Sequence, residues 1–513
     1  MQNASTIFAA DPLAAQREIE HLRCLNAELL DTINKQKSQI EQLEARLDWL
    51  IRQHFGRRSE RANPGQGSLF AEPEGNNEPA PPPPNEEVAG KQKKKGHGRQ
   101  KAAKELPRET QVIDVPESEK RCPCCGNEKI CIGQDKTERH DYQPPKIFIR
   151  ETVRPTYICR ECEQQGRPIQ ASQAPLPPEP IPRGIAAPGL LAHLIVSKYW
   201  DHLPLYRQGN MIERLGWPVS RSTLCDLVLA SADVLTPLYE LMCDRVRLSD
   251  ALHADDSQVT LLDPLRKAYA WVYVGDVAHP FTVFDLSVGR VQEHPQKFLD
   301  GYRGFIHADG YTGYNPLYQA GATHVGCWMH ARRYFFEAKD NDPARAHEAL
   351  ARIRELYAIE AEIKEHNLTG AELVECRRQR AGPILDDFAA WLTEETPKTL
   401  PKSKIGEAFI YASNQWPTLI RYIHDACLRI DNHPAEQAMR AVALGRKNWL
   451  HIGGDGGLPR AAVLLSLAAS AKRHRVAPWE YVKDLLTQIP ARAANADLSD
   501  LLPNAWSATH PSA

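Results

Sequence analysis

Three closely spaced strand-like runs between residues 252 and 289 restrict most strongly what this chain can fold into. They read LHADDSQVTLL, AYAWVYVGD and FTVFDLSVG, and the gaps between them are too short for a helix, which favours an antiparallel meander. Two later runs, GFIHADGY and THVGCWMH, are separated by the helix-length piece YTGYNPLYQAG. The order of these runs predicts an α/β layered domain with a mixed sheet.

Two adjacent aspartates, Asp255 and Asp256, interrupt the first run. A charge in apolar surroundings is unfavourable unless it is paired, hydrogen-bonded or bound to a metal, so this strand is expected to have a function. Side chains alternate along a strand, and only one of the two carboxylates can face a given side. Asp309 lies in the fourth run. If the first and fourth strands are neighbours, Asp255 and Asp309 converge at one edge of the sheet.

A third carboxylate is needed if two Mg²⁺ or Mn²⁺ ions are to be held, because hard cations take several oxygen ligands. The candidate is Glu436, in the stretch DNHPAEQAMRAVALGRKNWL. Pro434 is expected to be the first helical residue, which places Glu436 in the first turn and Arg440 one turn further on the same face. An acidic residue at this position can equally cap the helix and complement its dipole.

Residues 181 to 235 have a helical pattern that is broken at Gly216-Trp217-Pro218. The second helix is expected to be capped by Ser220 or Ser222. Two helices joined by a short turn describe a helix-turn-helix, whose second helix would offer its first residues to DNA bases or phosphates. A helical hairpin that binds nothing is the alternative. The predicted DNA-binding residues of this segment are Arg221, Ser222 and Thr223.

Two C-x2-C pairs, separated by 33 residues, lie upstream of these helices. Four thiolates in this arrangement can bind one Zn²⁺ tetrahedrally, with the intervening β-like residues forming a ribbon. Cys124 and Cys131 are close enough to compete as ligands, although we interpret both as buried thiols. The predicted zinc ligands are Cys122, Cys125, Cys159 and Cys162.

The N-terminal part combines a heptad pattern, a Pro-rich linker and a basic run. Eight of ten seam positions between Ile19 and Leu50 are apolar, which predicts a coiled coil; an amphipathic helix folded onto the same chain is the alternative. The linker contains PAPPPPNEE and cannot bury a core. Between Lys91 and Arg108, eight basic residues face one acidic residue, which indicates contact with nucleic acid or a solvated linker. The predicted DNA contacts here are Lys93, Lys94, Lys95 and Arg99.

Composition sets the cellular context. The 63 basic and 65 acidic residues nearly balance, and no apolar run approaches the roughly 20 residues of a membrane span. The N-terminus also lacks the pattern of a signal peptide. We therefore expect a cytoplasmic protein without a membrane partner, whose 12 cysteines are reduced and point to metal where they cluster.

Several motifs together resemble one known family. HADDSQV, HADGYTGYN, GCWMHARRYFF and GRKNWL, with FGRRSER upstream and AKRHRVAPWEYVKDLLTQIP downstream, are similar to the transposase of the insertion-sequence-66 family of bacterial mobile elements. The resemblance covers nearly the whole chain. It implies a DDE transposase with an RNase-H-like catalytic fold, in which Asp255, Asp309 and Glu436 are the catalytic residues and the Mg²⁺ ligands.

The resemblance also implies an architecture: a multidomain α+β protein with a coiled coil, a zinc ribbon, a helix-turn-helix and an RNase-H-like α/β catalytic domain that carries a helical insertion. The expected segments are 12–61 coiled coil, 62–104 Pro-rich and basic linker, 105–180 zinc ribbon, 181–240 helix-turn-helix, 245–455 catalytic domain with an insertion at about 335–425, and 460–513 C-terminal helices.

The activity implied is metal-dependent strand cleavage at the ends of the element and strand transfer into target DNA. Both ends must be held together, so a homodimer or larger assembly is expected near the nucleoid; the resemblance also allows accessory proteins of the same element as partners. The competing interpretation is a DNA-binding regulator with an inactive RNase-H-like domain.

Two departures from the family pattern concern residues near the carboxylates. The family usually has Asp-Glu-Thr where this chain has Asp255-Asp256-Ser257, and some other DDE families have a basic residue at the position of Ala443. His330 is interpreted as a packed histidine and Cys327 as a residue without a metal partner. In place of the basic residue that is absent at position 443, the residues expected to bind DNA phosphate are Arg440, Arg446 and Lys447.

Overall fold

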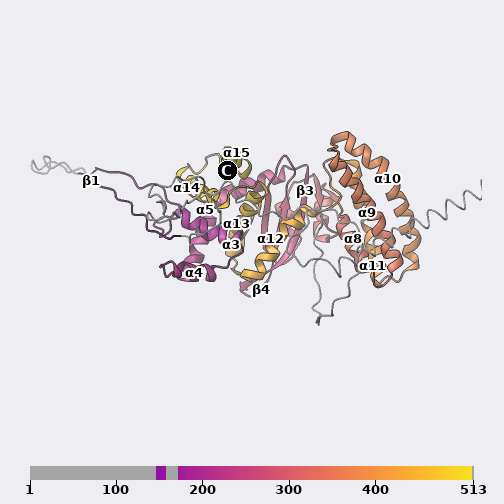
Figure 1. Cartoon of the computed structure of the whole chain (residues 1–513), viewed down its shortest axis with the longest axis horizontal. Coiled ribbons are helices and arrows are strands. Elements are labelled where there is room, and N and C mark those ends of the chain that lie inside the picture. The colour runs from indigo at the N-terminus through magenta and orange to yellow at the C-terminus, as the bar shows by residue number, and fades with distance from the viewer. Residues whose placement is uncertain (1–145, 158–171, 511–513) are drawn as a thin grey trace, which may run out of the picture. The chain divides into compact units, whose positions relative to one another are not determined.

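The structure, a computed structural model, describes residues 146–157 and 172–510 (Figure 1). The predicted coiled coil, the linker, the basic residues Lys93, Lys94, Lys95 and Arg99 and the four predicted zinc ligands lie outside the described residues, and these assignments stay predictions. At the start of the described chain, β1 (Thr156–Tyr157) and β2 (Ser172–Gln173) form a small antiparallel pair.

A mixed sheet forms the centre of the described chain. Its strands are β3 (Ala251–Asp263), β4 (Arg266–Val274), β5 (Thr282–Val288), β6 (Phe305–His307), β7 (Thr323–Val325) and β8 (Ile452–Gly454). The order is β5-β4-β3-β6-β7; the pairs β5–β4 and β4–β3 are antiparallel, whereas the pairs β3–β6 and β6–β7 are parallel. The predicted meander and the mixed sheet are therefore confirmed.

The long strand β3 has two partners on one side. Its first residues, Ala251 to His253, pair with β6, and its far end pairs with β8 through Leu261 and Asp263. Between these two segments no described strand pairs with that side of β3. Asp255 lies in this interval, two residues after the last pairing with β6, so the sheet leaves room there for another element to approach.

Helix α12 (His433–Trp449) lies along β3 and β4. It begins one residue before Pro434, the expected first residue, and Glu436 remains in its first turn. At the edge of the sheet, α13 (Gly457–Arg473) packs on β5. There the hydroxyls of Ser466 and Ser470 accept hydrogen bonds from the backbone N–H groups of Phe284 (2.8 Å) and Thr282 (3.0 Å). These serines satisfy donors that an edge strand otherwise leaves open.

The predicted helix-turn-helix corresponds to α4 (Leu205–Arg214) and α5 (Arg221–Arg247), preceded by α3 (Pro188–Tyr199). Ser220 is the N-cap of α5, and its hydroxyl accepts the N–H of Thr223 at 3.1 Å, as one of the two predicted caps. However, α5 has 27 residues and runs through the expected boundary at 240 to pack on β5 and α13. The buried apolar residues of α5 therefore belong to the same hydrophobic core as those of the sheet. They extend along more of the helix than packing against α4 alone would need.

Between β7 and α12 the chain forms a group of helices with a second core. They are α8 (Trp328–Glu337), α9 (Pro343–Glu365), α10 (Gly370–Glu395) and α11 (Lys404–Leu419). Figure 1 shows α9 and α10 side by side, and in this core the buried rings of Trp328 and Phe335 each pack at a tilt against the ring of Phe388. Buried Arg377 joins the group internally through its ion pair with Glu360 at 2.7 Å.

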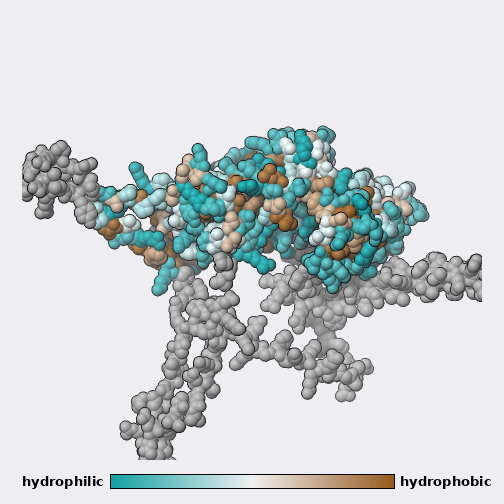
Figure 2. Space-filling model, turned by 90° about the horizontal axis from the view of Figure 1, so that it is seen from above, coloured by the Kyte–Doolittle hydropathy of each residue, from teal (hydrophilic) through white to brown (hydrophobic). Residues whose placement is uncertain are grey.

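Shorter elements complete the described chain. These are α6 (Glu293–Phe298), η1 (Thr312–Tyr314), α7 (Asn315–Gln319), η2 (Thr396–Lys398), η3 (Ile420–His424), α14 (Pro478–Gln488), η4 (Ile489–Ala491), η5 (Ser499–Leu501) and α15 (Pro503–Thr509). The face in Figure 2 is mostly hydrophilic with scattered hydrophobic residues. Among the described helices, none combines the length and the apolar character needed to cross a membrane.

Candidate active site

Two His-Ala-Asp triplets lie side by side at the centre of the sheet. In the parallel pairing of β3 with β6, His253 is opposite His307, so Asp255 and Asp309 each follow two residues later. The two buried imidazoles stack at 4.3 Å between ring centroids. Asp309 lies just beyond the end of β6, and its Oδ1 accepts the N–H of Tyr311 at 3.0 Å. The repeated triplet is a sequence signal that pairs the two aspartates.

Helix α12 is fixed to β3 at both of its ends. At its N-cap, Asn432 donates to the carbonyl of Ala254 at 2.8 Å, and its Oδ1 lies 3.0 Å from Nδ1 of His253. Near its C-terminus, Arg446 donates to the hydroxyl of Ser257 at 3.0 Å and to the carbonyl of Gln258. This attachment brings the first turn of α12, and with it Glu436, to the interval of β3 that contains Asp255.

The electrostatics of Asp255 reflect the other two carboxylates. Burial raises its pKa to about 8; the N–H of Asp256, 2.8 Å from Oδ1, opposes the shift, and the charges of Asp309, Asp256 and Glu436 add to it. The pKa of Glu436 is also raised, by burial first and then by Asp431, while Arg333 and His433 oppose the shift and Asp309 adds to it. Asp255, Asp309 and Glu436, predicted as a set, are therefore close enough to influence one another.

This cluster fits a divalent cation by the chemistry of its donors. Carboxylate oxygens are the ligands that Mg²⁺ and Mn²⁺ take in proteins, and a bound cation would offset the burial and the repulsion that raise the pKa of Asp255. The backbone N–H of Asn432, the N-cap of α12, donates to Cys327 Sγ rather than to Glu436, whose side chain is 30% exposed. A pure helix-capping role for Glu436 is therefore not supported by its contacts.

Asp256 has a different partner from Asp255. Its carboxylate forms a fork with Arg290, at 2.7 Å to Nη2 and 2.9 Å to Nε, and the guanidinium lies 3.7 Å above the ring of Tyr311. The Asp256 side chain is 6% exposed and that of Arg290 is 37% exposed. Burial still raises the pKa of Asp256, against the opposing effect of Arg290. The second aspartate is thus tolerated because an arginine pairs with it, and it holds a partly exposed cation near the cluster.

Cys327 and His330 also reach Glu436, a proximity that the sequence did not indicate. His330 Nδ1 lies 3.5 Å from Glu436 Oε1, and the Cys327 thiol donates to the same oxygen at 4.0 Å. The three potential ligand atoms lie within 4.8 Å of one another. Burial, and next Arg333, lowers the pKa of His330 to about 4, while Asp309 opposes the shift. Sequence spacing missed this group because its third member lies on α12, more than one hundred residues away.

Some of the predicted DNA-binding residues are exposed, whereas others contact other parts of the protein. Arg221 and Ser222, at the start of α5, and Arg440 and Lys447, on α12, are exposed and open to contact. Thr223 is half-buried beside the cap Ser220. In contrast, Arg446 is half-buried and its Nη1 donates to β3, as described above, so the predicted contact with DNA phosphate would use its other guanidinium donors.

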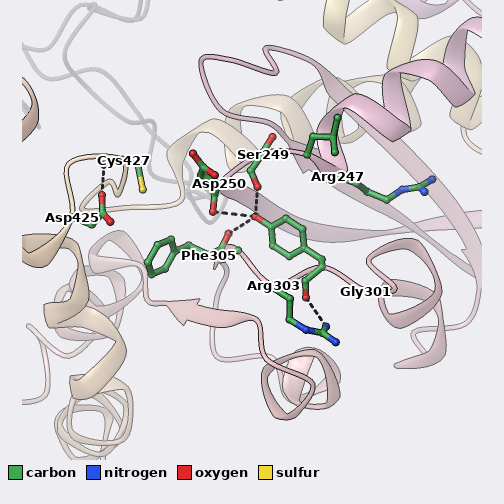
Figure 3. A pocket seen from close by; sticks show the side chains of 11 residues that line it. Arg247, Ser249, Asp250, Gly301, Arg303, Phe305, Asp425 and Cys427 are labelled. Atoms are coloured by element: carbon green, nitrogen blue, oxygen red, sulfur yellow. Dashed lines mark hydrogen bonds between the residues drawn. The ribbon is translucent and has the colours of Figure 1, made fainter.

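A hollow of about 600 Å³ lies elsewhere, at the opposite ends of the parallel strands (Figure 3). It is bordered by Arg247 and Asp250, which precede β3, by Arg303, which precedes β6, and by Asp425 and Cys427. Inside it, the hydroxyl of Tyr302 donates to the carbonyls of Ser249 and Phe305 at 2.9 and 3.1 Å. None of the three clustered carboxylates lines this hollow, so we treat it as separate from the candidate active site.

Four family models match the sequence, one after another along the chain. The model of the transposase IS66 family matches residues 183–459, which include Asp255, Asp309 and Glu436. Residues 42–110 match the family described as transposase C of IS166 homeodomain, residues 119–163 the zinc-finger binding domain of transposase IS66, and residues 466–504 the IS66 C-terminal element. The zinc-finger match includes all four predicted zinc ligands and supports binding of Zn²⁺.

Two relatives from Sinorhizobium fredii are similar over most of this chain. The uncharacterized protein y4hP is 33% identical over 429 residues, which cover 78% of this chain and 76% of y4hP. The uncharacterized protein y4jD is 31% identical over 441 residues, which cover 80% of this chain and 84% of y4jD. With four family models matched in order along the sequence, this chain belongs to the IS66 family of transposases.

Proposed function

We propose that this protein is a DDE-type transposase that cuts DNA at the ends of its element and joins the freed strand to target DNA. The observation that carries the proposal is geometric: the parallel pairing of β3 with β6 sets the two HAD triplets side by side, and the Asn432 and Arg446 contacts attach α12, which carries Glu436, to the same strand. The sheet order β5-β4-β3-β6-β7, with three antiparallel strands followed by two parallel ones, supports an RNase-H-like catalytic domain over residues 245–455.

In this proposal the three carboxylates hold Mg²⁺ or Mn²⁺. When bound, such ions lower the pKa of a water nucleophile and stabilise the negative charge of the leaving 3′-oxygen. The role of the protein is to fix the ligands: β3 and β6 position the aspartates, and the Asn432 contacts set the approach of Glu436. Arg290, held by Asp256, lies beside the cluster with part of its guanidinium exposed, where it would orient a DNA phosphate.

The remaining parts of the chain would recognise DNA and pair its ends. Exposed Arg221, Ser222, Arg440 and Lys447 are proposed phosphate or base contacts, together with the basic run that contains Lys93. A ribbon held by Zn²⁺ on Cys122, Cys125, Cys159 and Cys162 would form part of the same DNA-binding half. We propose that the whole protein acts at the nucleoid as a dimer or larger assembly, which its N-terminal helix joins.

The self-association proposal has a direct test. Deletion of residues 1–61 should lower the mass measured by sedimentation and reduce end pairing, while binding of a single DNA end persists. An unchanged mass would mean that the N-terminal helix folds back on its own chain.

The catalytic proposal is tested with neutral, nearly isosteric variants. Asp255→Asn, Asp309→Asn and Glu436→Gln should each lose Mg²⁺-dependent cleavage by roughly a thousandfold, because a metal ligand set supplies several kcal/mol to the transition state. Binding to the DNA end should stay within about threefold of the unmodified protein, because phosphate contacts elsewhere position the DNA. Asp263→Asn is the matched control, since Asp263 is an exposed aspartate at the end of the same strand.

Two outcomes would change the assignment. If Glu436→Gln cuts DNA normally, Glu436 serves only its helix; the next candidate is then buried Asp431, which accepts the Tyr357 hydroxyl at 3.0 Å. If the unmodified protein binds element ends but cuts no DNA with Mg²⁺ or Mn²⁺, the regulator interpretation replaces the transposase activity for this chain.

A further inference from the structure

Three potential metal ligands of different chemical types meet beside the carboxylates: the Cys327 thiol, the His330 imidazole and the Glu436 carboxylate. We propose that they form a binding site for a thiophilic divalent cation of the Zn²⁺ class, distinct from the Mg²⁺ that the carboxylates would hold. Only the consequence of this site for DNA cleavage rests on the proposed function; the binding itself does not.

The separations of the ligand atoms suit a tetrahedral ion. Zn²⁺ lies about 2.0–2.3 Å from nitrogen, oxygen and sulfur ligands, which places neighbouring ligands roughly 3.3–3.7 Å apart. His330 Nδ1 is 3.5 Å from Glu436 Oε1, and Cys327 Sγ is 4.0 Å from the same oxygen. Small side-chain adjustments would bring all three to one ion, and a water would take the fourth position.

The Nδ1 atom of His330 has no good partner in the described part of the chain. It is buried, and its approach to Glu436 does not have the geometry of a hydrogen bond. A buried polar atom without a hydrogen bond is destabilising by about 1–3 kcal/mol. A metal ion bound to Nδ1 would remove this penalty. Metal binding therefore explains why this nitrogen is buried without a hydrogen bond.

The local structure presents the two α8 ligands in the same direction. Cys327 is the N-cap of α8, and His330 lies in its first turn, so the C-x2-H spacing places both side chains at the start of one helix. Burial first, and then Glu436 and Asp431, raise the pKa of the Cys327 thiol, while the backbone N–H of Asn432, which donates to Sγ at 3.2 Å, opposes that shift; the positive charge of a bound ion would favour the thiolate. Binding of the ion would release the thiol proton to solvent.

The combination of a thiol, an imidazole and a carboxylate disfavours Mg²⁺, the cation expected at the three carboxylates. Mg²⁺ takes oxygen ligands in octahedral geometry, whereas sulfur and imidazole favour softer ions such as Zn²⁺. Glu436 belongs to both ligand sets and cannot complete both. Occupation by Zn²⁺ would therefore remove the third carboxylate from the catalytic cluster and inhibit cleavage.

The experiment counts zinc on the full chain. The protein is equilibrated with low micromolar Zn²⁺, freed of excess ion and assayed for metal by atomic emission. The Cys327→Ser, His330→Gln double variant should hold one equivalent less than the unmodified chain. Cys243→Ser, a buried thiol on α5, is the control and should hold the same amount as the unmodified chain. Circular dichroism checks that each variant is folded.

A second readout is the zinc concentration that halves Mg²⁺-dependent cleavage. For His330→Gln, which leaves all three catalytic carboxylates in place, this concentration should rise at least about tenfold. Equal zinc content in the double variant and the unmodified chain would overturn the site. So would a slower cleavage by His330→Gln at unchanged zinc content and zinc sensitivity, because His330 would then only position Glu436. If zinc content falls as expected but no protein cuts DNA, the site stands and the proposed function fails.

Discussion

Replacing Asp255 with asparagine should change how the stability of the protein depends on pH. In the folded protein without divalent cation, Asp255 keeps its proton up to about pH 8, because its pKa is raised to about 8. In the unfolded chain an aspartate ionises near 3.9. Between these values the unfolded chain binds fewer protons, so this group makes the folded state less stable as pH rises.

The size of the effect follows from proton linkage. One proton released on unfolding lowers the free energy of unfolding by up to about 1.4 kcal/mol per pH unit. From about pH 5 to pH 7, the unmodified protein should therefore lose up to about 2.7 kcal/mol relative to Asp255→Asn. Below about pH 4 the two proteins should not diverge further with pH. The amide oxygen of asparagine can still accept the N–H of Asp256, which keeps the packing matched.

Urea denaturation at several pH values, without added divalent cation, measures this difference directly. Added Mg²⁺ should reduce it, because a bound cation stabilises the ionised carboxylate of the unmodified protein and has one ligand less in the variant. Asp263→Asn, at the exposed end of β3, should follow the unmodified protein. Parallel pH curves for Asp255→Asn and the unmodified protein would refute the view that burial and neighbouring carboxylates hold a proton on Asp255.

Three further predictions concern other parts of the structure. Asp256→Asn should release Arg290 and raise the KM for DNA with a kcat within about tenfold of normal, measured by steady-state cleavage; a loss as deep as that of Asp255→Asn would contradict this separation of roles. Asn432→Ala should destabilise the fold by about 2–3 kcal/mol in urea denaturation, because buried hydrogen-bonding groups on β3 lose their partner; an unchanged midpoint would show that α12 is held by other contacts. Replacing Cys122 and Cys159 with serine should remove the zinc of the ribbon and leave the sheet folded; full zinc content in that variant would exclude this ligand set.

The sequence contained enough information to predict the sheet and the pair of aspartates. Strand runs separated by short gaps allow only a meander, and the two HAD triplets meet because their strands pair in parallel with His253 opposite His307. Glu436 was different: spacing placed it in the first turn of α12, but only the family resemblance assigned it to the site. No local pattern says which strand a helix lies on.

The parts that sequence reasoning missed all depend on contacts between distant segments. Arg446 resembles a phosphate-binding residue in sequence, yet β3 lies next to it and offers Ser257 and a carbonyl. The proximity of His330 and Cys327 to Glu436 depends on the packing of α8 against α12, which the local sequence does not specify. Likewise, the length of α5 follows from the core it shares with β5 and α13, which a helix-turn-helix pattern does not contain.

The serines of α13 have a consequence for how the protein is made. The backbone N–H groups of Phe284 and Thr282, on the edge strand β5, donate to serines that lie 182 and 188 positions later in the chain. During synthesis, the edge of the sheet therefore stays open until the ribosome has passed the start of the C-terminal element at residue 466. Glu436 also emerges late, so a nascent or prematurely terminated chain has neither a protected sheet nor a complete carboxylate set. Such a fragment would be prone to aggregation and, under the proposed function, unable to cut DNA.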